Sequence, residues 1–204
     1  NVGSEPSRIW GIDYASAFGS TYHKYTEKEY SAWLQYLFAL RDFTIGAYVD
    51  YRYVGVANLD DGAAEILRYE QRRVSTAGIG ISLVYNSRQE PIYEHGRYSG
   101  GVRGVYAMIE AVYRPELLSN IDKDILHLRA TFDYYQPLWR GGLLALDIYG
   151  ETVSSAMPWL LSPKLGGDSR MRGYYAGRLR GDYLASAQVE LRQHIWNGLG
   201  VVAW

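Results

Sequence analysis

Apolar residues recur at every second position over most of this chain, and that period restricts the possible folds more than any other feature. Between Phe43 and Tyr53 the odd-numbered positions are apolar or aromatic, whereas the even-numbered positions include Thr44, Asp50 and Arg52. Successive side chains of a β-strand point to opposite faces of its sheet. The alternation therefore predicts a strand with one apolar face and one polar face.

Five further stretches show the same alternation. Their apolar faces begin at Ala77, Val105, Leu126, Leu144 and Ala187, and the opposite faces carry mainly small, hydroxyl-bearing or charged residues. Weaker patterns at residues 8–17 and 30–40 add two strands, and a last strand starts at residue 198 and runs to the end of the sequence. We therefore predict about nine strands.

The connections between these strands differ in length. Residues 41–42, 137–142 and 196–198 form short turns, whereas residues 57–75 and 152–183 form long loops. Short turns thus fall at one end of the strands and long loops at the other, as in outer-membrane β-barrels. Aromatic residues gather at the strand ends, where a membrane barrel has its interfacial girdles: Tyr134, Tyr135, Trp139 and Trp196.

Composition excludes several other classes of protein. The chain has 204 residues and a formal net charge of −1, which gives no electrostatic reason to expect nucleic acid. Its 20 Tyr and six Trp residues exceed what a soluble core needs, and such rings prefer a boundary between apolar and aqueous surroundings. No stretch approaches the roughly 18 apolar residues of a membrane-spanning helix. The absence of cysteine excludes disulfides and cysteine-based zinc sites.

These features together predict an all-β fold, an antiparallel transmembrane β-barrel of the bacterial outer membrane, with residues 1–204 forming one partial barrel domain. The alternative is a soluble β-sandwich whose aromatic residues cap its core. We consider it weaker because sandwich strands rarely reach about ten residues with a charged row on the hidden side. The chain begins at Asn1 without an initiator Met or a signal peptide, which we interpret as mature sequence or an internal segment.

The most specific segment is residues 166–180, GGDSRMRGYYAGRLR, followed by the strand pattern LASAQVELRQHIW. This segment resembles the long extracellular loop and the next strand of the BamA/TamA-type outer-membrane assembly barrels, the bacterial surface antigen superfamily. Met171, Arg172, Gly173 and Tyr174 match the family's Arg-Gly-aromatic signature, and the accompanying glycines are Gly166, Gly167 and Gly177. The resemblance covers roughly residues 77–204.

The resemblance implies a sixteen-strand barrel, of which this chain is a portion, and a loop 152–183 that folds into the lumen. In the family the signature arginine is anchored to acidic residues of the inner wall. By strand parity Glu190 is the candidate partner of Arg172, with Asp147 and Glu151 as further candidates. The rigid guanidinium fork suits such paired hydrogen bonds. Gly173 is expected to permit a close backbone approach, and Tyr174 is expected to pack as a wedge.

The implied function is work on other polypeptides at the outer membrane. Members of the family insert client β-barrels into this membrane or move proteins across it. The expected partners are outer-membrane lipid, client outer-membrane or secreted proteins, and periplasmic or lipoprotein accessory subunits. Two alternatives stay open: a barrel that anchors and exports a patatin-type lipid hydrolase, and a plain porin-like channel, which a lumen-plugging loop disfavours.

Residue patterns for catalysis or cofactor binding are weak, so we predict that the chain is not an enzyme and needs no cofactor. Ser169 follows Gly167 and Asp168 as in some lipolytic enzymes, but the chain has no G-x-S-x-G elbow. The glycines precede a strand pattern instead of the helix that a phosphate-binding loop opens. The histidines lack metal-ligand spacing and occur singly: His23, His95, His127 and His194.

Overall fold

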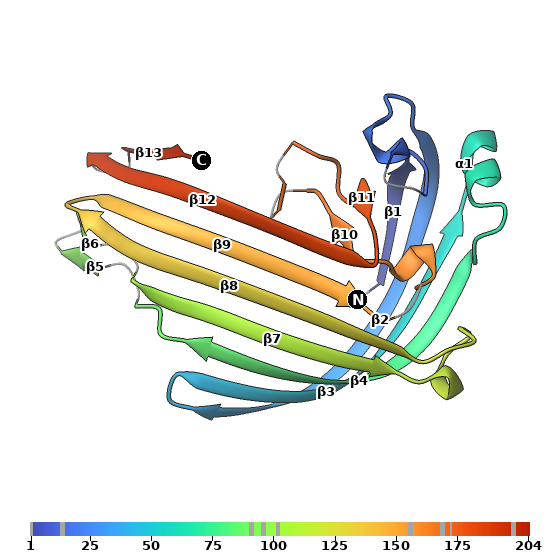
Figure 1. The fold of residues 1–204 in the computed structure, drawn as a ribbon, viewed down its shortest axis with the longest axis horizontal. Coiled ribbons are helices and arrows are strands. Elements are labelled where there is room, and N and C mark those ends of the chain that lie inside the picture. Colours follow the sequence, from blue (N-terminus) through green and yellow to red (C-terminus); the bar gives the residue numbers. More distant parts are fainter. Residues whose placement is uncertain are drawn as a thin grey trace.

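The computed structural model contains one large antiparallel sheet, and it describes residues 2–12, 15–89, 92–94, 97–100, 103–154, 157–167, 170–171, 173–196 and 199–204. Nine strands form this sheet in the order β1-β2-β3-β4-β7-β8-β9-β12-β13. The strands are β1 (Val2–Ile9), β2 (His23–Leu40), β3 (Phe43–Ala57), β4 (Arg73–Asn86), β7 (Gly104–Arg114), β8 (Ile125–Trp139), β9 (Gly142–Val153), β12 (Tyr183–Trp196) and β13 (Leu199–Ala203). Figure 1 shows that the sheet is bent into a trough.

The sheet is open, because β1 and β13 lie at its two edges without pairing to each other. Every neighbouring pair of strands is antiparallel and follows the order of the chain. The prediction of an all-β fold with about nine strands is confirmed, and a curved, open antiparallel sheet is consistent with a portion of a β-barrel.

Strand register places the predicted apolar residues on one face. Val49 pairs with Ile79, Ala47 with Ile81 and Ile45 with Leu83, so their side chains share a face. This face is the convex one, and Ile81 on it is 63% exposed. The polar residues of the same strands line the concave face.

Two predicted strand boundaries are wrong. Residues 8–17 do not form the first strand: β1 ends at Ile9, and Ser16–Phe18 form a short 3₁₀ helix, η1. The pattern of β1 is weak because the strand contains Pro6, which an edge strand tolerates since the missing N–H removes no ladder bond. The next strand, β2, begins at His23 instead of residue 30. Its first residues are polar on both faces, so no alternation marks them.

The connections separate by length with one exception. Short turns at residues 41–42 and 140–141 lie at one end of the trough, which we call the turn end. The opposite end, the loop end, carries η1, the helix α1 (Asp61–Ile66), the 3₁₀ helix η2 (Glu116–Leu118) and the long connection from β9 to β12. The exception is the β4–β7 connection, residues 87–103, which is long although it lies at the turn end. It contains a small hairpin of β5 (Ile92–Glu94) and β6 (Arg97–Gly100).

The concave face also differs from the prediction at the loop end, where it is apolar. Val54, Val74, Ile125 and Val153 point inward from four strands and are almost fully buried. They pack with residues of α1 and with the 3₁₀ helix η3 (Trp159–Leu161) of the β9–β12 connection. A hydrophobic core therefore closes this end of the trough, and the predicted polar inner face is restricted to the middle of the strands.

Candidate functional site: the loop on the concave face

Residues 154–182, which we call the β9–β12 loop, occupy the concave side of the trough between β12 and β1 (Figure 1). The loop contains η3 and a two-residue ladder between β10 (Lys164–Leu165) and β11 (Leu179–Arg180). Trp159, Leu160 and Leu161 are buried in the core described above. Hydrophobic burial thus fixes the start of the loop, and polar contacts fix the rest.

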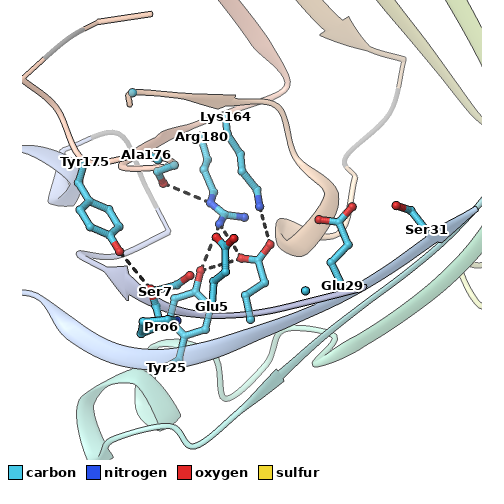
Figure 2. A pocket seen from close by; sticks show the side chains of 14 residues that line it. Glu5, Pro6, Ser7, Tyr25, Glu29, Ser31, Lys164, Tyr175, Ala176 and Arg180 are labelled. Atoms are coloured by element: carbon cyan, nitrogen blue, oxygen red, sulfur yellow. Dashed lines mark hydrogen bonds and ion pairs between the residues drawn. The ribbon is translucent and has the colours of Figure 1, made fainter. Parts of the chain in front are cut away.

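Two cations at the base of the loop share one carboxylate of β2. The Lys164 ammonium lies 2.7 Å from one oxygen of Glu27, and the Arg180 guanidinium lies 3.3 Å from the other. Arg180 also donates to the hydroxyl of Tyr25 at 3.2 Å and to the carbonyl of Trp159 at 3.0 Å. Figure 2 shows the side chains of Lys164, Arg180 and Tyr25 converging here. We call Glu27, Lys164 and Arg180 the base cluster.

The base cluster brings two cations onto a single carboxylate. Desolvation, followed by the nearby positive charge of Arg180, lowers the pKa of Lys164 from its usual value of 10.5 despite the opposing effect of Glu27. The negative charge of Glu27 therefore offsets the repulsion between the Lys164 and Arg180 cations.

A second set of contacts joins the loop to β1 and to the connection between β1 and β2. The hydroxyl of Tyr175 donates to the carbonyl of Pro6 at 3.2 Å, on the free edge of β1. Arg178 donates to the carbonyls of Ala17 and Gly19 at 2.7 and 3.1 Å, and its guanidinium stacks 4.8 Å from the ring centre of Trp10. The loop therefore covers an edge strand that has only one neighbour in the sheet.

The predicted acidic partners all lie on the concave wall. Asp147 forms an ion pair with Arg170 of the loop. Glu151 is held within the wall, because it binds His127 at 2.6 Å and also contacts Tyr149 and Arg129. Glu190 is buried and contacts Gln188 and, at 2.6 Å, Arg192 of its own strand.

Arg172, the central residue of the predicted motif, lies outside the described residues, as do Asp168, Ser169 and His95. Its pairing with Glu190, Asp147 or Glu151 therefore stays a prediction. The loop arginine that the structure does place on an acidic wall residue is Arg170.

The other motif residues form a tight turn. Tyr174 donates its N–H to the carbonyl of Met171, and Gly167 donates to the carbonyl of Tyr174. Gly173 has a φ of 98°, and a Cβ there would meet none of the described residues within 4 Å. This positive φ favours glycine, and the close backbone approach expected at Gly173 stays a prediction. Close approach occurs at Gly166, where a Cβ would lie 2.2 Å from the carbonyl oxygen of Tyr175.

Gly167 and Gly177 also have positive φ, at 94° and 72°. Tyr174 is 37% exposed, and Arg178 lies 5.8 Å from its ring centre. The neighbouring Tyr175 makes the docking contact instead, with Pro6. The sequence offered a signal for this, since the motif contains two consecutive tyrosines, but nothing in it distinguishes which one faces β1.

A glycine row on β4 allows charged residues of its two neighbours to meet. The guanidinium of Arg114 on β7 reaches the carboxylate of Asp50 on β3 at 2.8 Å, passing over Gly78. A Cβ at Gly78 would lie 2.7 Å from Asp50, and a Cβ at Gly80 would lie 2.2 Å from the ring of Tyr48. The small residues that the sequence places on the inner face of β4 thus leave room for an ion pair that spans three strands.

Two polar cavities lie beside the base cluster. Cavity I, of about 590 Å³, lies between β1, β2 and the β10–β11 ladder, and its lining includes Glu5, Tyr175 and Arg180. Cavity II, of about 360 Å³, lies against β2, β3, β8 and β9, and its lining includes Arg52, Glu151 and Ser162. Glu27, Glu29 and Lys164 line both cavities.

Within the described part of the chain, no group of three or more His, Asp or Glu side chains could hold a metal ion. His127 is engaged by Glu151, and His23 lies 3.3 Å from Asp60. Among the described residues, no helix is both long and apolar enough to span a membrane.

Comparison with known proteins found no match: no family model, no curated protein and no solved structure is similar to this chain.

Proposed function

We propose that this chain is part of an outer-membrane β-barrel of the assembly or translocation type, with its convex face in lipid and its concave face around a lumen. The observation that carries the proposal is the distribution of polarity between the two faces. Apolar side chains are exposed over the convex face, whereas the concave face buries charged side chains such as Arg114, Glu151 and Glu190. A protein that folds in water arranges its side chains the other way.

The convex apolar residues form a continuous surface over eight strands. Its exposed members include Leu34, Phe38, Ile45, Val49, Ile79, Ile81, Leu83, Ile109, Leu128, Phe132, Ile148, Val189, Leu191 and Val201. Soluble monomers rarely expose contiguous apolar patches beyond a few hundred Å². Acyl chains are the partner that fits an apolar belt around a curved sheet.

Aromatic pairs mark both borders of this surface. Tyr30 packs against Tyr53 at 5.7 Å between ring centres near the loop end, and Phe43 packs against Tyr85 at 4.9 Å near the turn end. The rise from Phe43 to Tyr53 is about 33 Å along the strand. With a tilt of about 40°, the belt is about 25 Å high, which is the height of the apolar band of outer-membrane barrels.

The assembly or translocation type is supported by the β9–β12 loop. Its sequence resembles the signature loop of the BamA/TamA-type barrels, and in the structure the loop lies inside the trough, with contacts to β1, β2 and β9. A loop that folds into the lumen of the complete barrel would disfavour a plain channel. The proposed partners are outer-membrane lipid and client outer-membrane or secreted polypeptides.

Depletion of the protein in its natural host tests this function. We expect other outer-membrane barrels to fall in abundance and to accumulate in unfolded, protease-sensitive form. Their folded fraction is measured by the heat-dependent shift of barrel proteins in electrophoresis. Normal levels of folded barrels and of secreted proteins after depletion would contradict the proposal.

A further inference from the structure

The convex face carries two cations just beyond its aromatic border at the loop end. Tyr30 on β2 and Tyr53 on β3 form that border. Two residues further along the strands, Lys28 pairs with Gly55 across β2 and β3, and Gly55 pairs with Arg73 across β3 and β4. Both cations therefore lie on the same face as the apolar belt, with their backbones about 10 Å apart.

The side chain of Tyr53 occupies the space between these two cations. A Cβ at Gly55 would lie 3.1 Å from the Tyr53 hydroxyl oxygen, so the ring leans over the glycine towards the loop end. Lys28 and Arg73 are both exposed. Within the described part of the chain, neither cation forms an ion pair and the Tyr53 hydroxyl makes no hydrogen bond. Three donors, two of them charged, thus face outwards without an acceptor from these residues.

Charge is distributed unevenly along the loop end of the convex face. On β1 to β4, none of the convex strand positions beyond the Tyr30–Tyr53 pair is acidic, and the cationic ones are Arg8, Lys24, Lys28 and Arg73. Arg8 and Lys24 lie directly opposite each other, and like charges placed in this way destabilise a sheet. At the same end of β7, β8, β9 and β12 the convex positions are uncharged: Tyr113, Leu126, Thr152 and Tyr183. The first four strands therefore carry a local positive patch that suits an anion.

We propose that Lys28, Arg73 and the hydroxyl of Tyr53 bind a phosphate monoester on the headgroup of a lipid. The inference rests on the proposed function, because headgroups lie beside this patch only where the convex face is in lipid. With the strand rise and a tilt of about 40°, Lys28 and Arg73 lie about 5 Å beyond the aromatic border along the membrane normal. This is the level at which headgroups follow the acyl chains.

The chemistry of the three donors favours a monoester over a diester. A phosphate monoester carries about 1.5 to 2 negative charges at neutral pH and has three free oxygens, so it accepts from two cations and a hydroxyl together. The planar fork of Arg73 suits two parallel hydrogen bonds to phosphate, and Lys28 adds a compact charge. The long connections of outer-membrane barrels face outwards, so the ligand belongs to the outer leaflet. Lipid A is a lipid with this headgroup chemistry.

Binding of lipid A to the complete protein tests this site. Diphosphoryl lipid A is titrated into the protein in uncharged detergent micelles, and the bound fraction is measured by native mass spectrometry. The double variant Lys28→Gln with Arg73→Gln is expected to raise the Kd about tenfold or more, because each cation near a charged headgroup contributes to binding. Tyr53→Phe removes one hydrogen bond and is expected to raise the Kd about threefold.

The matched control is the double variant Arg41→Gln with Arg140→Gln. It removes the same charge from two exposed cations in the short turns at the turn end. We expect its Kd to stay within about twofold of that of the parent, since the charge lies far from the site. An equal rise in both double variants would show unspecific attraction between net charges and would overturn the inference. An unchanged Kd in the folded Lys28→Gln, Arg73→Gln protein would also overturn it.

Two competing ligands identify the chemistry of the bound group. Phosphatidylglycerol, a phosphate diester, is expected to bind about tenfold more weakly than lipid A because it carries less charge. Millimolar inorganic phosphate is expected to leave lipid A bound, since free phosphate lacks the acyl chains that the apolar belt contacts. Equal affinity for phosphatidylglycerol, or displacement of lipid A by phosphate, rejects a lipid phosphate monoester as the ligand.

Membrane insertion is measured separately, by resistance of the complete protein to alkaline extraction from phospholipid vesicles. A protein that inserts but binds lipid A equally well in all variants contradicts this inference and leaves the proposed function standing. A protein that does not insert contradicts the proposed function itself.

Discussion

The convex and concave faces of this sheet use the same strands and the same backbone, yet they have opposite chemistry. On the convex face Val189 is 55% exposed, whereas Glu190, the next residue, is 6% exposed on the concave face. Exposed valine beside buried glutamate is the reverse of the usual order in water. Relative exposure alone therefore does not mark the interior of this sheet, because the apolar side chains of its convex face are more exposed than the neighbouring charged ones.

The largest expected effect concerns the buried charges of the concave face. Arg114→Met leaves Asp50 buried without its ion-pair partner, and both side chains are largely buried. We expect the free energy of unfolding, measured by urea titration in phospholipid vesicles, to fall by about 3–5 kcal/mol.

The double variant Asp50→Leu with Arg114→Met removes both charges and is expected to recover much of this loss. If the double variant instead lost as much free energy of unfolding as the two single variants together, the concave face would not depend on charge pairing.

A smaller effect is expected from a charge placed on the convex face. Val189→Arg is predicted to reduce stability in vesicles by about 2–4 kcal/mol, since arginine is unfavourable near the middle of a bilayer. Gln188→Arg is the matched control, because the adjacent side chain lies on the concave face and contacts Glu190. If the protein were surrounded by water, Val189→Arg would change stability by no more than about 0.5 kcal/mol.

The smallest expected effect on stability concerns Asp60 at the loop end, outside both faces of the sheet. Asp60 caps α1 by accepting from the N–H of Ala63 at 2.8 Å, and it also accepts from the N–H of Lys24 at 2.7 Å. These bonds, that of Lys24 first, lower the pKa of Asp60 from its usual value of 3.8. A lowered folded-state pKa gives stabilisation that is present above the unfolded-state value and is lost as the pH falls through the folded-state value.

Hydrogen exchange of the Ala63 amide, corrected for its intrinsic rate, should therefore show weakening of α1 on acidification from about pH 6 to about pH 3. Asp60→Asn retains a capping oxygen without a titrating carboxyl, so its protection should be independent of pH in this range. Identical pH profiles for both proteins would show that Asp60 does not hold α1.

The alternation of side chains predicted the strands from β3 to β12 and their two faces. From β3 to β12 the apolar sets predicted from the sequence share the convex face, as the pairing of Val189 with Leu146 illustrates. Alternation failed where both faces are polar, as in the first part of β2. It also did not predict the hydrophobic core at the loop end. Val54 and Val74 interrupt the polar inner rows of their strands, but the segments that pack against them are far away in the sequence.

The loop was predictable in outline only. Its length and its glycine-rich signature were visible in the sequence, and Asp147 lies on the concave face, where it pairs with Arg170 of the loop. The base cluster was missed, because Glu27 and Lys164 are 137 positions apart and no local pattern relates them. Contacts of this kind depend on how the trough curves, which the sequence pattern does not specify.

Single cysteines in β12 test the contact of the convex face with lipid most directly. We would place them at Ala187, Val189 and Leu191 on the convex face and at Gln188 and Arg192 on the concave face, in vesicles, with a water-soluble maleimide. We expect the two concave cysteines to react and the three convex ones to be protected. Fast reaction at the convex positions, as expected of exposed side chains in water, would contradict it.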